Sequence, residues 1–324
     1  MSSRLAIATL ALAGLGASHA VAEPLTQGDA LQILERIATA ARTQNYEGTF
    51  VYQHGERVET SRIVHFVDTD GEHEKLETLD GPRREIIRNN DEVLCFYPDA
   101  KIVRSQQRIA KRSFPALVPE QLSSIAQYYS IRKGRTERVA GFEAQVVILQ
   151  PNDAMRYGHK LWAETNTGLL LKARTLNEAR QVVEQFAFTQ LNIGSGVTRE
   201  MVNPSYKANI PEWRLDRFAQ SMLSEVETGW TVRDFPPGFR KIMDMRRTKQ
   251  GGRVVTHMVY SDGMAAVSIF IESMPGRSVN EGLSRQGAIN IYRRAVGDNL
   301  VTVLGETPAV TVMQIGNSVV FEKR

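Results

Sequence analysis

The sequence contains almost no cysteine and none of the short motifs that carry common catalytic or metal chemistry. Cys95 is the one cysteine in 324 residues, so neither an internal disulfide framework nor a thiolate zinc site can form. No HExxH, GxSxG, CxxC, P-loop or EF-hand pattern is present. Five of the six histidines are scattered over predicted strands and turns: His54, His65, His73, His159 and His257. These absences favour a binding protein without metal or cofactor over an enzyme.

Long apolar runs are missing beyond the first 22 residues. That first segment has an early cation, Arg4, and an apolar run over residues 5–17. Small residues precede two candidate cleavage positions, after Ala20 or after Ala22, so the pattern predicts a secretory signal peptide at residues 1–22. No later run reaches the roughly 18 apolar residues that a membrane-spanning helix needs. We therefore expect a soluble, exported protein.

Net charge is small, at +4, but the charges are unevenly distributed. Residues 101–138 hold nine lysines and arginines against two glutamates, whereas residues 56–80 hold eight acids against three cations. The basic segment could bind an anionic ligand or could pair with the acidic one. The candidates for anionic-ligand binding are Arg104, Arg108, Lys111, Arg112, Arg132 and Lys133. The chain is expected to be exported and has no aromatic stacking platform on a basic face, so nucleic acid is not expected as its partner.

Hydrophobic periodicity predicts one leading helix followed by an antiparallel meander. Apolar residues at spacings of three and four predict a helix over residues 26–45, with Thr26 as its cap. From Tyr46 the period becomes two, and turn signals punctuate the chain to residue 192. One face of the sheet is predicted to carry the large aromatics Phe50, Tyr52, Phe96, Trp162, Phe186 and Phe188. That face forms either an apolar ligand pocket or a closed core.

The strand periodicity ends near residue 192, and this break divides the chain into two predicted domains. Residues 23–203 form the first domain, residues 204–219 a linker, and residues 220–324 a smaller α+β domain with an antiparallel sheet. Asp262-Gly263 is a hairpin signal within the second domain. Residues 309–321 fit a terminal helix, although their β-branched content also allows a strand.

Six stretches resemble the RseB/MucB family of periplasmic regulators. The most specific is LDGPRREIIRNNDEVLCFYPD at residues 79–99. In the same order as in that family come YEGTFVYQHG, RYGHKLWAETNTGLLLKARTL, VVEQFAF, GWTVRDFPPGF and VYSDGMAAVSIF. The resemblance covers essentially the whole chain after the signal segment. Within the DGPRRE block, one of Arg83 and Arg84 pairs with Glu85 or with an acid of residues 68–80, or these arginines contact a partner.

The resemblance implies an α+β protein whose first domain is a half-open antiparallel β-barrel with a helical cap, similar to lipoprotein carriers. It implies a periplasmic, non-enzymatic regulator that binds the periplasmic domain of a membrane-spanning anti-sigma factor. Binding would protect that domain from regulated proteolysis. A lipid-type stress signal, either lipopolysaccharide or lipoprotein acyl chains, would release the regulator. The alternative is a periplasmic lipid or lipoprotein carrier or chaperone.

The second domain holds the excess of positive charge, which predicts a surface for the anti-sigma partner. The candidate contacts are Arg233, Arg240, Arg246, Arg247, Arg253, Arg293 and Arg294. Whether the protein forms a homo-oligomer is left open by the sequence.

Overall fold

The computed structural model describes residues 23–107, 113–119, 122–206, 212–217, 228–248, 254–276 and 280–322. The predicted signal peptide lies outside these ranges. So do four predicted binding residues, Arg108, Lys111, Arg112 and Arg253, together with the side chain of Arg247. Among the described residues, no helix is long and apolar enough to cross a membrane.

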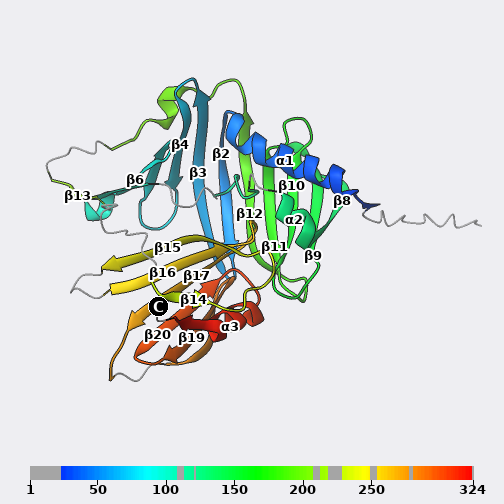
Figure 1. The fold of residues 1–324 in the computed structure, drawn as a ribbon. Coiled ribbons are helices and arrows are strands. Elements are labelled where there is room, and N and C mark those ends of the chain that lie inside the picture. The colour runs from blue at the N-terminus through cyan, green and yellow to red at the C-terminus, as the bar shows by residue number, and fades with distance from the viewer. Residues whose placement is uncertain are drawn as a thin grey trace, which may run out of the picture.

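A curled sheet of 13 strands forms the larger part of the molecule (Figure 1). Its strands are β1 (Glu23–Pro24), β2 (Tyr46–His54), β3 (Arg57–Asp68), β4 (Gly71–Thr78), β5 (Glu85–Asn89), β6 (Glu92–Tyr97), β7 (Ile102–Gln107), β8 (Tyr129–Val139), β9 (Phe142–Pro151), β10 (Gly158–Glu164), β11 (Leu170–Leu176), β12 (Val182–Ile193) and β13 (Arg214–Arg217). The spatial order is β1-β8-β9-β10-β11-β12-β2-β3-β4-β5-β6-β7-β13. All neighbours are antiparallel except β13, which runs parallel to β7.

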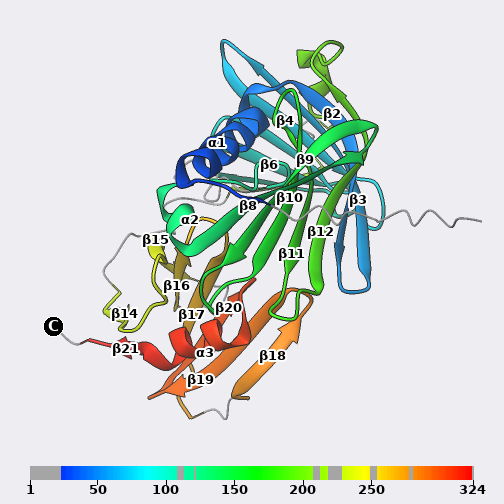
Figure 2. The ribbon, with the colours of Figure 1, turned by 90° about the vertical axis from the view of Figure 1, so that its right-hand side faces the viewer.

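Two helices cover one face of this sheet, here called the inner face. Helix α1 (Gln27–Thr43) and helix α2 (Ser123–Tyr128) lie together beside β8 (Figure 2). Thr26 caps α1, because its Oγ1 accepts a hydrogen bond from the Asp29 amide at 3.2 Å. The buried stripe of α1, including Leu34 and Ile37, packs into a core shared with Leu149 of β9. Short 3-10 turns occur at Pro98–Ala100 (η1) and Arg199–Val202 (η2).

The second part of the chain forms a smaller sheet with one helix. Its strands are β15 (Arg240–Thr248), β16 (Val254–Ser261), β17 (Ala266–Ser273), β18 (Gly282–Gln286), β19 (Ile289–Val296) and β20 (Asn299–Gly305), in the order β15-β16-β17-β20-β19-β18. Helix α3 (Ala309–Ser318) packs on this sheet, and β14 (Trp230–Val232) pairs with β21 (Val319–Phe321). Residues 309–321 are therefore a helix followed by a strand, so each alternative is right for part of the segment. The predicted α+β class, with a half-open barrel and a helical cap, is confirmed.

The predicted linker contributes structure of its own. Arg214–Arg217 within it forms β13, which adds a strand to the large sheet beside β7. Trp213, just before β13, packs with its ring centroid 6.3 Å from that of Phe96. Lys101 and Glu212 form an exposed ion pair at 2.8 Å. The end of this segment is therefore anchored to the first sheet.

A buried ion pair joins the two sheets. Arg156, in the loop between β9 and β10, donates from Nη1 to Oδ2 of Asp262 at 2.9 Å, and both side chains are fully buried. The guanidinium also donates from Nε to both Asp153 oxygens at 3.1 Å and from Nη2 to the Pro237 carbonyl at 2.6 Å. Its Cζ lies 4.6 Å from the ring centroid of Tyr128. We call Arg156 and Asp262 the interdomain ion pair.

The hairpin that carries Asp262 packs into the core of the first domain, beside α2. Asp262 Oδ1 accepts hydrogen bonds from the amides of Met264 and Ala265, which fixes the turn between β16 and β17. The Met264 side chain is buried within the core of the first domain. Gly263 has φ +99°, and a Cβ there would lie 3.3 Å from Pro119. The two domains therefore interlock.

Removing the acidic partner should be far more damaging here than at the surface. Asp262→Ala removes the fully buried one of the two carboxylates that Arg156 meets, so we expect unfolding free energy to fall by about 3–5 kcal/mol. Urea denaturation followed by circular dichroism measures the change. Asp99→Ala is the matched control, because it breaks the exposed Arg83–Asp99 pair and should leave the midpoint almost unchanged. Equal midpoints for the two variants would show that the interdomain ion pair contributes little.

Candidate functional site

Four of the six predicted pocket aromatics meet on the inner face, at the junction of β2 and β12. Tyr52 is the register partner of Phe186, and Phe50 is the register partner of Phe188. Partners across an antiparallel pair point to the same side of a sheet. The rings of Tyr52 and Phe186 stack with centroids 4.5 Å apart. Those of Phe50 and Phe188 meet edge to face at 6.0 Å.

A fifth aromatic, Phe114, closes this cluster and was missed by the sequence reasoning. It comes from the segment between β7 and α2, and its ring centroid lies 5.1 Å from Phe50, 5.3 Å from Phe186 and 4.9 Å from Phe188. Its own side chain is only 3% exposed. The apolar run from Phe114 to Val118, which interrupts the basic segment, is the sequence signal that marked it. Phe50, Phe114 and Phe188 are therefore buried together in one packed cluster.

Phe96 and Trp162 do not share the inner face, so the predicted grouping is wrong for these two residues. Phe96 pairs with Glu85 and Val103 and packs beside Trp213 on the outer face. On β10, Leu161 and Ala163 belong to the inner core, so Trp162 between them points outward. The period of two places alternate residues on opposite faces, but only the register between strands decides which set is inside.

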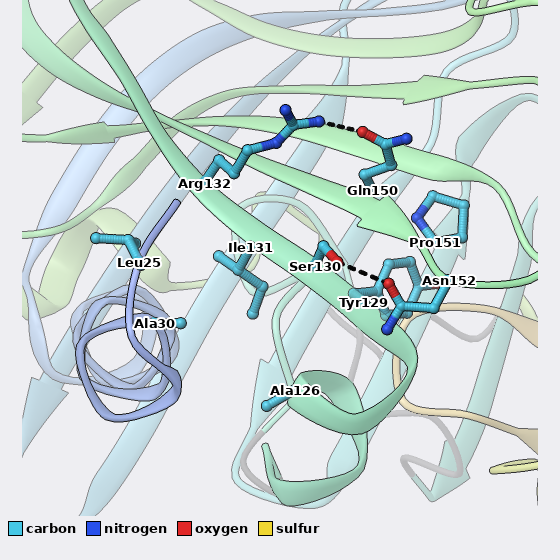
Figure 3. A pocket seen from close by; sticks show the side chains of 10 residues that line it. All are labelled: Leu25, Ala30, Ala126, Tyr129, Ser130, Ile131, Arg132, Gln150, Pro151 and Asn152. Carbon is cyan, nitrogen blue, oxygen red and sulfur yellow. Dashed lines mark hydrogen bonds between the residues drawn. The ribbon is translucent and has the colours of Figure 1, made fainter. Parts of the chain in front are cut away.

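A cavity of about 580 Å³ opens where the start of α1, helix α2 and strands β8 and β9 meet (Figure 3). Its apolar wall is made by Leu25, Ala30, Ala126 and Ile131. Its polar lining comprises Ser130, Arg132, Gln150 and Asn152. The size lies in the range of small-molecule sites, and the mixed lining suits an amphiphile.

Arg132 supplies the positive charge of this cavity. One Nη of Arg132 donates to the Gln150 amide oxygen. Its Nε is buried and has no hydrogen-bond partner among the described residues. A buried donor without a partner is unfavourable, so this nitrogen has an unused hydrogen bond to donate. Ser130 donates to Asn152 Oδ1 at 2.7 Å on the same rim.

The other described anionic-ligand candidates lie elsewhere. Lys133 is exposed on β8, next to Arg132. Arg104 is on β7, near the other end of the strand order, where its Nε lies 3.7 Å from Asp216. Of the three candidates that the structure describes, Arg104 is therefore far along the sheet from Arg132 and Lys133. Among the described residues, no three His, Cys, Asp or Glu side chains are grouped to hold a metal ion.

A second hollow, of about 460 Å³, surrounds the DGPRRE block. Arg83 donates from its amide, Nε and Nη2 to Asp99 at 2.8–3.1 Å, so its role is structural, but its partner is neither Glu85 nor an acid of residues 68–80. The hydrogen bonds and charge of Asp99 hold the pKa of Arg83 above its ordinary value. Arg84 also lines the hollow, and the nearby Val58 is 54% exposed. Arg84 therefore remains a candidate contact for a partner.

The predicted partner-binding arginines of the second domain are spread over its surface. Arg293 and Arg294 are neighbours on β19 and so point to opposite faces. Arg294 donates to the Asn317 carbonyl at 2.9 Å, and Arg246 on β15 donates to the Thr228 carbonyl at 3.2 Å. Arg233 pairs with Glu322 at 3.3 Å, and Arg240 is exposed at the start of β15. The five arginines with described side chains therefore lie on different parts of the domain, and their partner role stays a prediction.

Two family models match the chain and together cover most of it. They are the MucB/RseB N-terminal domain over residues 29–206 and the MucB/RseB C-terminal domain over residues 224–320. The sigma factor AlgU regulatory protein MucB of Pseudomonas aeruginosa is 33% identical over 307 residues, 92% of this chain and 93% of that protein. The sigma-E factor regulatory protein RseB of Escherichia coli K12 is 25% identical over 292 residues, 89% of this chain and 90% of that protein.

Solved structures show the same similarity. A crystal structure of MucB in complex with MucA(peri) matches with a TM-score of 0.74 and 31% identity, covering 91% of this chain and 100% of that one. A crystal structure of MucB matches with a TM-score of 0.64 and 29% identity, covering 90% and 98%. Sequence and fold agree over both domains, and the chain belongs to the MucB/RseB family.

Proposed function

We propose that this protein is a periplasmic regulator that binds the periplasmic domain of a membrane-spanning anti-sigma factor and shields it from regulated proteolysis. The observation that carries the proposal is the match to MucB in complex with MucA(peri), which spans 91% of this chain. A regulator of this kind needs a stable arrangement of its domains to present one binding surface. The interdomain ion pair and the inserted Met264 supply such an arrangement.

The second part of the proposal is release by a lipid-type signal, either lipopolysaccharide or a lipoprotein acyl chain. The cavity beside α1 and α2 supports it, because an apolar wall and the Arg132 guanidinium suit an anionic amphiphile. Release requires that the lipid bind the partner-free protein better than the partner-bound protein.

A structural connection exists between this cavity and the domain interface. Tyr129 lines the cavity, and its hydroxyl donates to Asp262 Oδ2 at 3.4 Å. Ala126 of α2 lines the same cavity, while Tyr128 at the end of that helix lies under Arg156. A ligand that displaces α2 would therefore disturb the contacts of the interdomain ion pair. This gives the lipid a physical route by which to change partner affinity.

The alternative function is a lipid or lipoprotein carrier, which the same cavity would also serve. A carrier moves lipid between membranes whether or not an anti-sigma factor is present. Lipid transfer between donor and acceptor vesicles, measured with and without the anti-sigma periplasmic domain, separates the two functions. Fast lipid transfer without the anti-sigma periplasmic domain, together with no effect of the protein on proteolysis of that domain, would favour the carrier.

The regulatory function predicts protection of the partner from its protease. At a protein concentration 100 times the Kd, about 1% of the anti-sigma periplasmic domain is free, so its cleavage should slow roughly 100-fold. Gel densitometry over time measures the cleavage rate. An unrelated substrate of the same protease should be cleaved at its usual rate, which excludes inhibition of the protease. Undiminished cleavage of the anti-sigma domain would contradict the proposed function.

Charge reversal at the cavity should weaken the lipid response. Arg132→Glu replaces the one arginine among the lining residues, and loss of a charge-assisted hydrogen bond of about 1.5–3 kcal/mol should raise the half-maximal lipid concentration for release at least tenfold. Release of a labelled anti-sigma domain, followed by fluorescence anisotropy, measures this. Lys133→Glu makes the same change of charge on the adjacent exposed residue and should behave almost like the unmodified protein. If both variants respond alike, Arg132 does not contact the lipid.

A further inference from the structure

Several cations gather around Trp162 on the outer face of the large sheet. The ring of Trp162 is buried, with 1% of its surface exposed. The Lys160 and Lys172 Nζ atoms lie 4.5 Å and 4.8 Å from the centroid of this ring, and the Arg174 Cζ lies 5.5 Å from it. The three positive groups are therefore within about 10 Å of one another, since each is near the same ring.

The strand register forces these like charges together. Lys160 on β10 is directly opposite Arg174 on β11, and Lys172 is directly opposite Trp162. Like charges at opposite positions of neighbouring strands destabilise a sheet. Burial lowers the pKa of Lys172 from its ordinary value, and the charges of Arg174 and Lys160 lower it further. This part of the sheet therefore carries an electrostatic cost that a bound anion would remove.

The positive charges are only partly neutralised within the chain. Glu137 accepts hydrogen bonds from Trp162 Nε1 at 2.8 Å and from Lys160 Nζ at 3.3 Å, and Arg135 lies 3.4 Å away. Burial raises the pKa of Glu137, but the Trp162 hydrogen bond and the Lys160 charge outweigh this and lower it overall. Among the described residues, neither Lys172 nor Arg174 has a carboxylate oxygen within 4 Å. One carboxylate thus serves four cations.

Apolar groups accompany the cations on the same face. Trp162 packs with Val146 and Leu171, and Val139, Phe142 and Ile148 are only partly buried against this cluster. The stems of lysine and arginine can cover such groups while their charged ends stay in water. We call this set of four cations, Glu137 and the surrounding apolar residues the Trp162 patch.

We propose that the Trp162 patch docks on an anionic phospholipid surface. Its cations come from separate strands of one sheet face, so they are spread over an area rather than directed into one small site. A bilayer surface offers many phosphates at once, together with an interfacial layer for the partly exposed apolar groups. This goes beyond the proposed regulatory function, and it would concentrate the protein at the membrane that its proposed partner spans.

Vesicle flotation tests the proposal with the mature protein. We expect binding to phosphatidylcholine vesicles that contain about 30 mol% anionic phosphatidylglycerol, and no binding to pure phosphatidylcholine. Each cation near an anionic surface contributes about a fivefold gain in partitioning, so the triple variant K160Q/K172Q/R174Q should bind roughly 100-fold more weakly. Binding of the unmodified protein should fall as salt is raised.

A second triple variant controls for net charge. R57Q/K101Q/R214Q also removes three cations, but these are exposed and each lies beside a carboxylate, of Glu59, Glu212 and Asp216 respectively. It should keep vesicle binding within about threefold. Equal losses in the two variants, or no binding of the unmodified protein to anionic vesicles, would overturn the proposal. The proposal would also be overturned if the protein bound soluble polyphosphate or an acidic peptide but did not bind vesicles.

Two further measurements keep the result separate from folding and from the proposed function. The K160Q/K172Q/R174Q variant should unfold at an unchanged or higher urea concentration, because it removes mutual repulsion. It should also bind the anti-sigma periplasmic domain in solution as the unmodified protein does. Loss of vesicle binding together with unfolding, reproduced by the single variant K172Q, would mean that the patch is structural and would overturn the proposal.

Discussion

The structure depends on one buried contact between the domains, the Arg156–Asp262 ion pair. Burial of an ion pair is favourable only where hydrogen bonds satisfy both charged groups completely. Here the guanidinium meets two carboxylates, a backbone carbonyl and an aromatic face, while Asp262 also fixes the turn of its own hairpin. A pair of this kind specifies one arrangement of the domains, since any other arrangement leaves a buried charge unpaired.

The consequence is that the helices, the cavity and the second domain form one mechanical unit. Helix α2 contributes Ala126 to the cavity and Ile125 to the core, and its last residue, Tyr128, lies under Arg156. The hairpin of the second domain places Met264 in that same core. This packing therefore links the cavity beside α1 and α2 to the second domain.

The two faces of the large sheet have different physical characters. The inner face is closed by five aromatic rings, of which Phe114 is supplied by a connecting segment rather than by a strand. The outer face carries Trp162 beneath cations that the strand register brings together against their mutual repulsion. Aromatic packing on the inner face therefore stabilises the fold, whereas the like charges around Trp162 on the outer face oppose it.

The sequence alone determined the features that arise from local spacing. The three-and-four period gave helix α1 with Thr26 at its cap, the period of two gave the meander, and Asp262-Gly263 marked a hairpin. Six ordered motifs were enough to indicate the MucB/RseB family. The sequence alone could not assign Phe96 and Trp162 to the outer face or place Phe114 in the aromatic cluster. Nor could it pair Arg156 with Asp262, which is 106 residues away. Alternation along a strand is a local property of the sequence. Which face is buried, and which distant charges meet, depends on strand register and on packing across the whole sheet, so both follow from the tertiary structure.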